Sequence, residues 1–133
     1  MNILKGEIEK LTVRNNLTLV GINVGKSSLS SIVIDTPESA PYLKIGNTIN
    51  VIFKETEVII GRGKVQAISL QNKLEGHVES IETGDLLSRL ILNTTAGRII
   101  SVITTNAVNQ LELKNGTEIT AMIKTNEMML QHD

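Results

Sequence analysis

Residues 72–76, Asn-Lys-Leu-Glu-Gly, repeat residues 2–6, Asn-Ile-Leu-Lys-Gly, at a distance of 70 positions. Extending this register outward aligns residues 1–63 with residues 71–133 without a gap, and 13 of the 63 aligned pairs are identical. Ordinary composition would give roughly 4 identities by chance. The stretch therefore marks a duplication, and a repeat that holds over the whole chain decides the fold.

The repeat predicts two copies of one module, at residues 1–63 and 71–133, with residues 64–70 either a linker or an exchanged strand. A module of roughly 60 residues buries only a modest share of its surface and is marginally stable alone. We expect duplication, and association of several chains, to supply the missing burial.

Each copy contains five short runs of branched aliphatic residues separated by turn residues, a pattern that predicts β-strands. The runs are 4–13, 17–24, 29–34, 49–53 and 57–60 in copy one, and 74–81, 86–93, 99–104, 119–123 and 127–130 in copy two. One short helix is predicted between the third and fourth strands of each copy. Thr36 offers a cap followed by Pro37, and Thr105 or Asn106 can cap a turn that runs to Leu111. The expected fold is all-β, with two tandem OB-like five-stranded barrels, each with one short helix.

The composition excludes several classes of protein. The 133 residues include no Cys, one Tyr and one Phe, and the formal net charge is −1. Without Cys there is no disulfide framework, thiolate metal site or Cys nucleophile, which fits a cytoplasmic location. The charge gives no basic field, and the two aromatic rings are a poor platform for bases, so we expect no nucleic-acid partner. The apolar runs are too short to cross a membrane, and the N-terminus does not resemble a secretory signal.

Three features that resemble reactive sites have simpler interpretations. Residues 21–27, Gly-Ile-Asn-Val-Gly-Lys-Ser, have three residues between the glycines where a phosphate loop has four, and the pattern favours a hairpin. His77 and His132 have no second ligand at a useful spacing, so no metal site is expected. Glu57 and Glu127 are each lone in their copy and favour solvation or ion pairing over catalysis. We therefore expect no enzyme activity.

A set of small polar residues and lysines lies near the predicted strand ends. Hydroxyls, amides and an amino group are suited to holding a small oxyanion. The same residue types also close turns and cover surfaces, so spacing alone leaves both roles open. The set comprises Asn2, Ser31, Lys54, Ser69, Asn72, Ser101, Thr104 and Lys124.

Three segments of copy two resemble a known family in order and spacing. Residues 69–76, Ser-Leu-Gln-Asn-Lys-Leu-Glu-Gly, resemble the Ser-Ala-Arg-Asn-Gln-Leu-Lys-Gly opening of molybdate-binding Mop/TOBE modules. Residues 101–108 resemble the Ser-x-Ile-Thr-x-x-Ser segment of these modules, and residues 111–124 resemble their Leu-x-Leu-x-x-Gly-x-x-Val-x-Ala-x-Ile-Lys run. Copy one matches more loosely, through residues 2–6 and 43–46. The whole chain resembles a molbindin with tandem Mop modules.

This resemblance implies a cytoplasmic protein that binds molybdate or tungstate for storage and homeostasis, without an organic cofactor. It also implies a homotrimer with the oxyanions held at the interfaces between modules. The alternative is a regulatory module that senses the oxyanion and acts through a protein partner, because the chain shows neither a helix-turn-helix region nor a true phosphate loop. By motif position, the candidate ligands are Ser69, Gln71, Asn72, Ser101, Thr104 and Lys124, with Ser31 and Lys54 as counterparts in copy one.

The chain departs from the family pattern at specific positions. Gln71 stands where the family has Arg, which removes a charge and a forked donor. Copy one starts at Met1 and lacks the Ser-x-Arg portion, and Ile34 occupies the position of Thr104. We therefore expect that the two copies need not bind alike.

Overall fold

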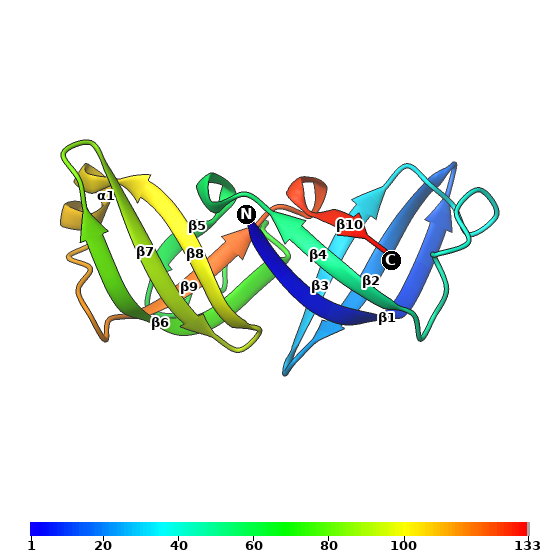
Figure 1. Cartoon of the computed structure of the whole chain (residues 1–133), viewed down its shortest axis with the longest axis horizontal. Coiled ribbons are helices and arrows are strands. Elements are labelled where there is room, and N and C mark those ends of the chain that lie inside the picture. The colour runs from blue at the N-terminus through cyan, green and yellow to red at the C-terminus, as the bar shows by residue number, and fades with distance from the viewer. Residues whose placement is uncertain (133) are drawn as a thin grey trace.

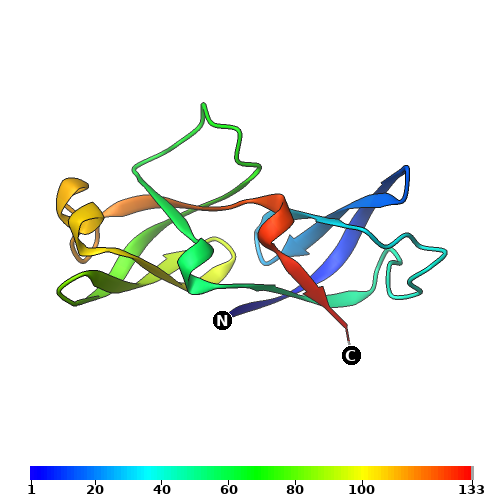
Figure 2. The same ribbon diagram turned by 90° about the horizontal axis from the view of Figure 1, so that it is seen from above.

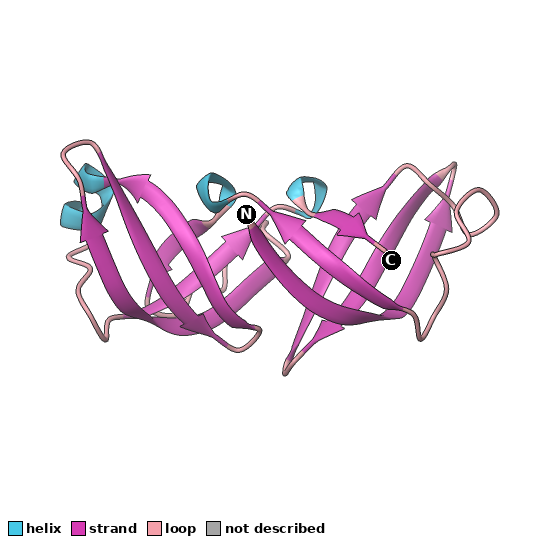
Figure 3. Ribbon diagram, viewed as in Figure 1, coloured by secondary structure: helices cyan, strands magenta, loops and turns pink. Residues whose placement is uncertain are grey.

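The computed structural model describes residues 1–132 and consists mainly of strands in two lobes side by side (Figures 1 and 3). The first lobe contains β1 (Asn2–Arg14), β2 (Leu17–Val24), β3 (Ser27–Val33) and β4 (Thr48–Phe53). The second contains β6 (Asn72–Thr83), β7 (Leu87–Thr94), β8 (Gly97–Thr104), α1 (Thr105–Gln110) and β9 (Glu118–Ile123). Within the described chain, no helix is long and apolar enough to cross a membrane.

The fifth strand of each sheet comes from the other copy. The short 3-10 turn η1 (Glu55–Glu57) leads into β5 (Ile59–Arg62), which pairs with β9 of the second lobe. The equivalent turn η2 (Thr125–Glu127) leads into β10 (Met129–Gln131), which pairs with β4 of the first lobe. The strand orders are β10-β4-β1-β2-β3 and β5-β9-β6-β7-β8. The prediction of two tandem five-stranded OB-like units is confirmed, and each unit is completed by the other.

The segment at 64–70 contains no strand, so the crossing is made at 59–62 and 129–131 instead. Figure 2 shows 64–70 as a loop standing away from both lobes. Val65 N donates to Thr120 Oγ1 at 3.2 Å, and Lys73 Nζ donates to the Gln66 carbonyl at 3.3 Å. The segment is therefore a tethered loop.

The prediction of a helix in each copy is wrong for copy one. In copy two, Thr104 Oγ1 accepts a hydrogen bond from Ala107 N and caps α1, one residue before the predicted cap. Copy one has Ile34 and Pro37 at these two positions, so neither the acceptor nor the donor exists. Residues 36–42 form turns instead.

Both first strands bend at the same place. The register of β1 shifts between Ile8 and Lys10, and the register of β6 shifts at the equivalent positions, which marks a β-bulge in each. A Cβ on Gly6 or Gly76 would meet the carbonyl oxygen of the neighbouring strand, at Asn23 or Asn93. Glycine therefore permits the close approach that curls each sheet toward a barrel.

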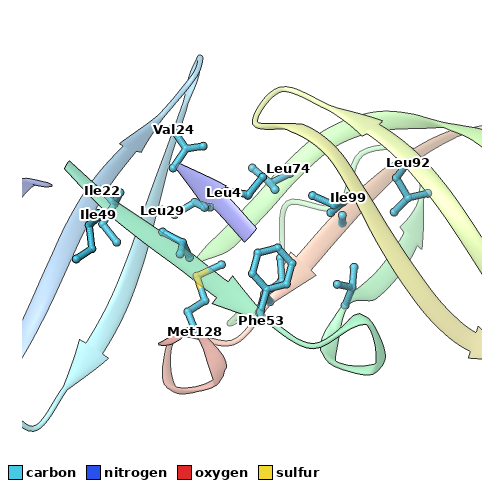
Figure 4. Close-up of a cluster of buried hydrophobic side chains, with 14 of the residues drawn as sticks. Leu4, Ile22, Val24, Leu29, Ile49, Phe53, Leu74, Leu92, Ile99 and Met128 are labelled. Carbon is cyan, nitrogen blue, oxygen red and sulfur yellow. The ribbon is translucent and has the colours of Figure 1, made fainter. Parts of the chain in front are cut away.

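One continuous aliphatic core joins the two lobes. Figure 4 shows Leu4 and Leu74 between the buried side chains of the two copies, with Phe53 and Met128 below them. All four are less than a tenth exposed and belong to a single cluster of contacting residues. Because the exchanged strands and this core are shared, the duplication folds as one unit.

Candidate functional site

The candidate site is built on the two turns where the chain crosses between lobes. Lys54 and Lys124 precede η1 and η2 in the same extended conformation, with φ of −75° and −67°. Glu57 N donates to the Lys54 carbonyl at 3.0 Å, and Glu127 N donates to the Lys124 carbonyl at 3.1 Å. Both lysines are exposed. The two turns lie next to each other in Figures 1 and 2, and the charges of both lysines act on Glu127 of η2.

Two buried serines hold the crossing segments in place. Ser101 on β8 donates its hydroxyl proton to the Val58 carbonyl at 3.0 Å, and Ser31 on β3 donates to the Met128 carbonyl at 2.9 Å. Both hydroxyls are fully buried, and a hydroxyl has only one proton to donate. In this chain the serines therefore bind backbone and leave no donor for an anion.

Two asparagines make a second symmetric link between the copies. Asn72 accepts from Ser30 N at 2.7 Å and donates to the Ser30 carbonyl at 2.9 Å. Asn2 makes the same two contacts with the backbone of Ile100, both at 2.8 Å. Each side-chain amide thus makes the two backbone hydrogen bonds that a neighbouring strand would make at the edge of β3 or β8. Asn2 belongs to the polar set near the predicted strand ends but not to the candidate ligands, and the 70-residue register makes it the counterpart of Asn72.

The structure pairs lysines and serines across the copies. Turn η1, which follows Lys54, packs against β8, the strand of Ser101. Turn η2, which follows Lys124, packs against β3, the strand of Ser31. Sequence position alone groups Ser101 with Lys124, whereas the fold sets Ser101 beside the segment from Lys54. The exchange of β5 and β10 is the reason.

The remaining candidate ligands lie away from the buried links. Ser69 and Gln71 are exposed at the end of the 64–70 loop. Thr104 is exposed, and its oxygen accepts the capping bond of α1, which leaves its hydroxyl proton available. The exposed donors among the eight candidates are thus Lys54, Lys124, Ser69, Gln71 and Thr104.

Glu57 and Glu127 meet at the crossing, which sequence reasoning missed. Hydrogen bonding with Glu57 raises the pKa of Glu127 above its usual value, followed by burial and the charge of Glu57. Lys124 and Lys54 oppose this effect and lower the pKa. Each glutamate is lone within its copy, but the 70-residue register relates them and could have identified the pair. The crossing therefore carries two cations and two acids.

A hollow of about 380 Å³ lies where the β2–β3 hairpin meets the β7–β8 hairpin. Lys26 N donates to the Thr95 carbonyl at 3.4 Å, and the hydroxyls of Ser27 and Thr95 lie 2.5 Å apart. Lys73 and Glu75 also line the hollow. The lining of this hollow thus includes two lysines, Lys26 and Lys73, and one carboxylate, Glu75.

The first lobe has an aromatic pair in which Tyr42 of copy one meets His132 of copy two. The rings of Tyr42 and His132 stack with centroids 4.5 Å apart. Burial raises the pKa of Tyr42, and the charge of Asp35 and a hydrogen bond from the Tyr42 hydroxyl to Asp35 raise it further. Among the described residues, His, Cys, Asp and Glu form no group of three suited to a metal ion.

Comparison with known proteins places the second copy in a recognised domain family. The TOBE domain model matches residues 68–130. Molybdenum-pterin-binding protein 1 of Clostridium pasteurianum is 34% identical over 65 residues, which are 48% of this chain and 96% of that protein. Molybdenum-pterin-binding protein 3 of the same organism is 32% identical over the same shares of the two chains.

Two further matches extend over nearly the whole chain. The molybdenum import ATP-binding protein ModC of Rhizobium etli is 26% identical over 124 residues, 92% of this chain but only 32% of that protein. A crystal structure of the cytoplasmic molybdate-binding protein ModG with molybdate bound has a TM-score of 0.91 and 28% identity, covering 99% of this chain and 96% of that one. The tandem arrangement is thus shared with a solved structure.

Proposed function

Because the chain belongs to the Mop/TOBE family of molbindins, we propose that it binds molybdate or tungstate in the cytoplasm for storage and homeostasis. The observation that carries the proposal is the pair of lysine turns at the crossing, in a fold whose solved relative holds molybdate. The function is binding without a chemical step. Fixed donors and positive charge satisfy a tetrahedral dianion.

The oxyanions are held at interfaces between modules of different chains, in a homotrimer. The small number of hydrogen-bond donors that remain available within one chain supports this arrangement. Ser31, Ser101 and Asn72 have their protons engaged inside the chain, so two lysines and a few exposed groups remain. These are too few to surround a tetrahedral anion, so further donors come from a neighbouring copy.

The outer face of copy one supports association between chains. Leu19 and Ile32 lie opposite each other on β2 and β3, and Leu17 and Ile34 extend the same apolar set. All four are exposed, at 42%, 41%, 47% and 83% respectively. A contiguous exposed apolar set of this kind marks an interaction surface. The trimer would cover it.

The two lysines contribute unequally. The turn after Lys54 packs against β8, which ends in the exposed hydroxyl of Thr104. The turn after Lys124 packs against β3, beyond which the chain continues to Ile34. An apolar side chain offers no donor, so we expect the Lys54 site to bind the anion more tightly.

Calorimetric titration with molybdate, tungstate, sulfate and phosphate tests the proposal. We expect binding of molybdate and tungstate and weaker or no binding of sulfate and phosphate. Lys54→Ala is expected to weaken molybdate binding at least about tenfold, because a charge-assisted contact contributes about 1.5–3 kcal/mol. Lys124→Ala is expected to weaken it less.

Lys10→Ala, which removes an exposed lysine from β1, is the matched control and should leave the affinity unchanged. Native mass measurement tests the assembly. Absence of molybdate and tungstate binding would overturn the function, and a pure monomer that binds the anions would overturn the interfacial site.

The match to ModC favours a second candidate function. Nearly all of this chain corresponds to one third of an ATP-binding import protein. A tandem module of this kind therefore occurs as part of a larger protein, where anion occupancy can act on other domains. The present chain would then sense the oxyanion and act through a protein partner, and capture of one specific partner only in the presence of molybdate would favour this role.

A further inference from the structure

The tips of the β2–β3 and β7–β8 hairpins meet in the middle of the molecule (Figure 1). Lys26 N donates to the Thr95 carbonyl at 3.4 Å, and Thr95 N donates to the Glu75 carbonyl at 3.1 Å. These hydrogen bonds join a hairpin of copy one to a hairpin and a strand of copy two. The hollow of about 380 Å³ at this junction falls within the size range of small-molecule sites.

Three parts of the chain line this hollow. Lys73 and Glu75 lie two residues apart on β6, so their side chains project from the same face of the sheet. Lys26 comes from the hairpin turn of copy one, and Val65 and Gln66 come from the 64–70 loop. Lys73 Nζ donates to the Gln66 carbonyl at 3.3 Å, which leaves two of its three protons for a ligand. Both copies and the loop between them thus contribute to one lining.

The three charged side chains of the lining have no opposite charge to pair with inside the chain. Lys26, Lys73 and Glu75 are exposed, and none of them forms an ion pair with another of residues 1–132. The hollow therefore presents two unpaired positive charges and one unpaired negative charge to a ligand.

A pair of hydroxyl groups adds one hydrogen-bond donor. Ser27 Oγ and Thr95 Oγ1 lie 2.5 Å apart, so one hydroxyl donates to the other and the second proton remains available. The other two hydroxyls of the lining donate to Glu9 and to the Gly63 carbonyl, and add none. Lysines and hydroxyls suit a phosphate group, whose oxygens accept hydrogen bonds from several directions, whereas a carboxylate is matched best by the planar fork of arginine.

The charged groups of this lining are not repeated at the equivalent position in the other copy. The residues that correspond in the 70-residue register to Lys26, Lys73, Glu75 and Thr95 are Ala96, Ile3, Lys5 and Gly25. The 64–70 loop has no counterpart in the aligned copies. The hollow therefore differs from the lysine turns, which both copies contain.

We propose that this hollow binds a small phosphate monoester that also carries an amino group. The phosphate contacts Lys26, Lys73 and the available hydroxyl proton, and the ammonium group contacts Glu75. Two negative charges and one positive charge on the ligand then match the opposite charges of the lining. A bare oxyanion matches the lining less well, because Glu75 repels it and is left without a partner. The site is separate from the proposed oxyanion site at the lysine turns.

Calorimetric titration of the full chain with O-phosphoethanolamine tests the assignment, with inorganic phosphate, ethanolamine and aspartate as comparisons. We expect O-phosphoethanolamine to bind more tightly than the other three compounds. Lys26→Ala and Lys73→Ala should each weaken its binding at least about tenfold, because each removes a charge-assisted contact. Lys10→Ala, which removes an exposed lysine from β1, is the matched control and should leave the affinity unchanged.

Glu75→Gln separates a binding role of the carboxylate from a structural one. It should weaken the binding of O-phosphoethanolamine and strengthen that of inorganic phosphate, because it removes the partner of the ammonium group and a repulsive charge together. A change of both affinities in the same direction would overturn the proposal. So would binding of O-phosphoethanolamine no tighter than that of inorganic phosphate or aspartate.

Titration of Lys26→Ala with molybdate tests the separation of the two sites. The molybdate affinity should equal that of the wild-type chain, and a loss parallel to that of O-phosphoethanolamine would contradict two separate sites. Thermal unfolding of each variant verifies that it folds.

Discussion

The segment after the third strand differs most clearly between the two copies. In copy two it forms the capped helix α1, whereas in copy one residues 36–42 form turns. Three substitutions explain the difference. Ile34 replaces the capping Thr104, Pro37 replaces the donor at Ala107, and Pro41 replaces Leu111, whose N–H donates to the Ala107 carbonyl at 3.0 Å. The first two remove the acceptor and the donor of the capping hydrogen bond, and the third removes a backbone hydrogen bond of the helix.

The crossing, in contrast, is the same in both copies. Four of the 13 identical pairs lie there, namely Asn2/Asn72, Ser31/Ser101, Lys54/Lys124 and Glu57/Glu127. The asparagines and serines make equivalent hydrogen bonds in the two lobes. The comparison shows that the repeat keeps the exchange of strands and its charged cluster while the outer ends diverge.

The largest expected effect tests whether the two exchanged segments, which lead into β5 and β10, are held equally strongly by the opposite copy. Ser101→Ala removes the donor to the buried Val58 carbonyl, and Ser31→Ala removes the donor to the Met128 carbonyl. A buried acceptor left without a partner costs about 1–3 kcal/mol, and we expect similar losses for both variants. Unfolding in urea measures the free energy.

Ser30→Ala is the control for these variants. Ser30 lies beside Ser31 on β3, and the backbone of Ser30, rather than its hydroxyl, binds Asn72. Its loss should therefore be small. A loss in Ser30→Ala equal to that in Ser31→Ala would show that the buried hydroxyl bond does not hold the crossing.

The next effect concerns the helix that only copy two forms. Thr104→Ala removes the cap of α1 and should cost about 1 kcal/mol, since a capping hydroxyl is worth about 0.5–2 kcal/mol. The reciprocal change, Ile34→Thr, should give no comparable gain, because Pro37 has no N–H for the new hydroxyl to bind. Urea unfolding measures both. Stabilisation by Ile34→Thr equal to the loss in Thr104→Ala would contradict this account of the two segments.

The strand content and the tandem arrangement could be predicted from the sequence. The spacing of apolar residues indicates the strands, and the repeat indicates the two modules. The exchange of strands could not be predicted. Residues 57–60 and 127–130 occupy equivalent positions, so either fifth strand fits either sheet with the same pattern. The choice is made by the turns η1 and η2 and by the shared core, which depend on contacts far apart in the chain.

The candidate site could also be predicted only in part. Motif position identified Lys54 and Lys124, which the structure leaves exposed at the crossing. It could not show that the hydroxyl protons of Ser31 and Ser101 are engaged with backbone, because their partners belong to the other copy. Glu57 is predicted to be alone for the same reason, because Glu127, the residue that it influences, belongs to the other copy.

The smallest effect concerns the ion pair on the bulge of copy two. Glu79 accepts hydrogen bonds from Asn93 and Arg98, both at 2.9 Å, and these contacts lower its pKa. A carboxyl group whose pKa is lowered by folding stabilises the fold above its unfolded-state pKa. This contribution is lost as the pH falls through the folded-state pKa.

In copy one the residue equivalent to Arg98 is Ser28, whose hydroxyl donates to Glu9 at 2.9 Å. Arg98→Ser therefore gives copy two the pairing of copy one. The hydrogen bond from Asn93 remains, so the pKa of Glu79 should move only part of the way back toward its usual value. Titration of the Glu79 carboxyl by NMR measures the shift. Because Arg98 is exposed, Glu79 is only partly buried and solvent screens their ion pair, the change in stability should be the smallest of the series. An unchanged Glu79 pKa in Arg98→Ser would mean that Asn93 alone holds the carboxylate, and that the two bulges are electrostatically alike despite the different partners.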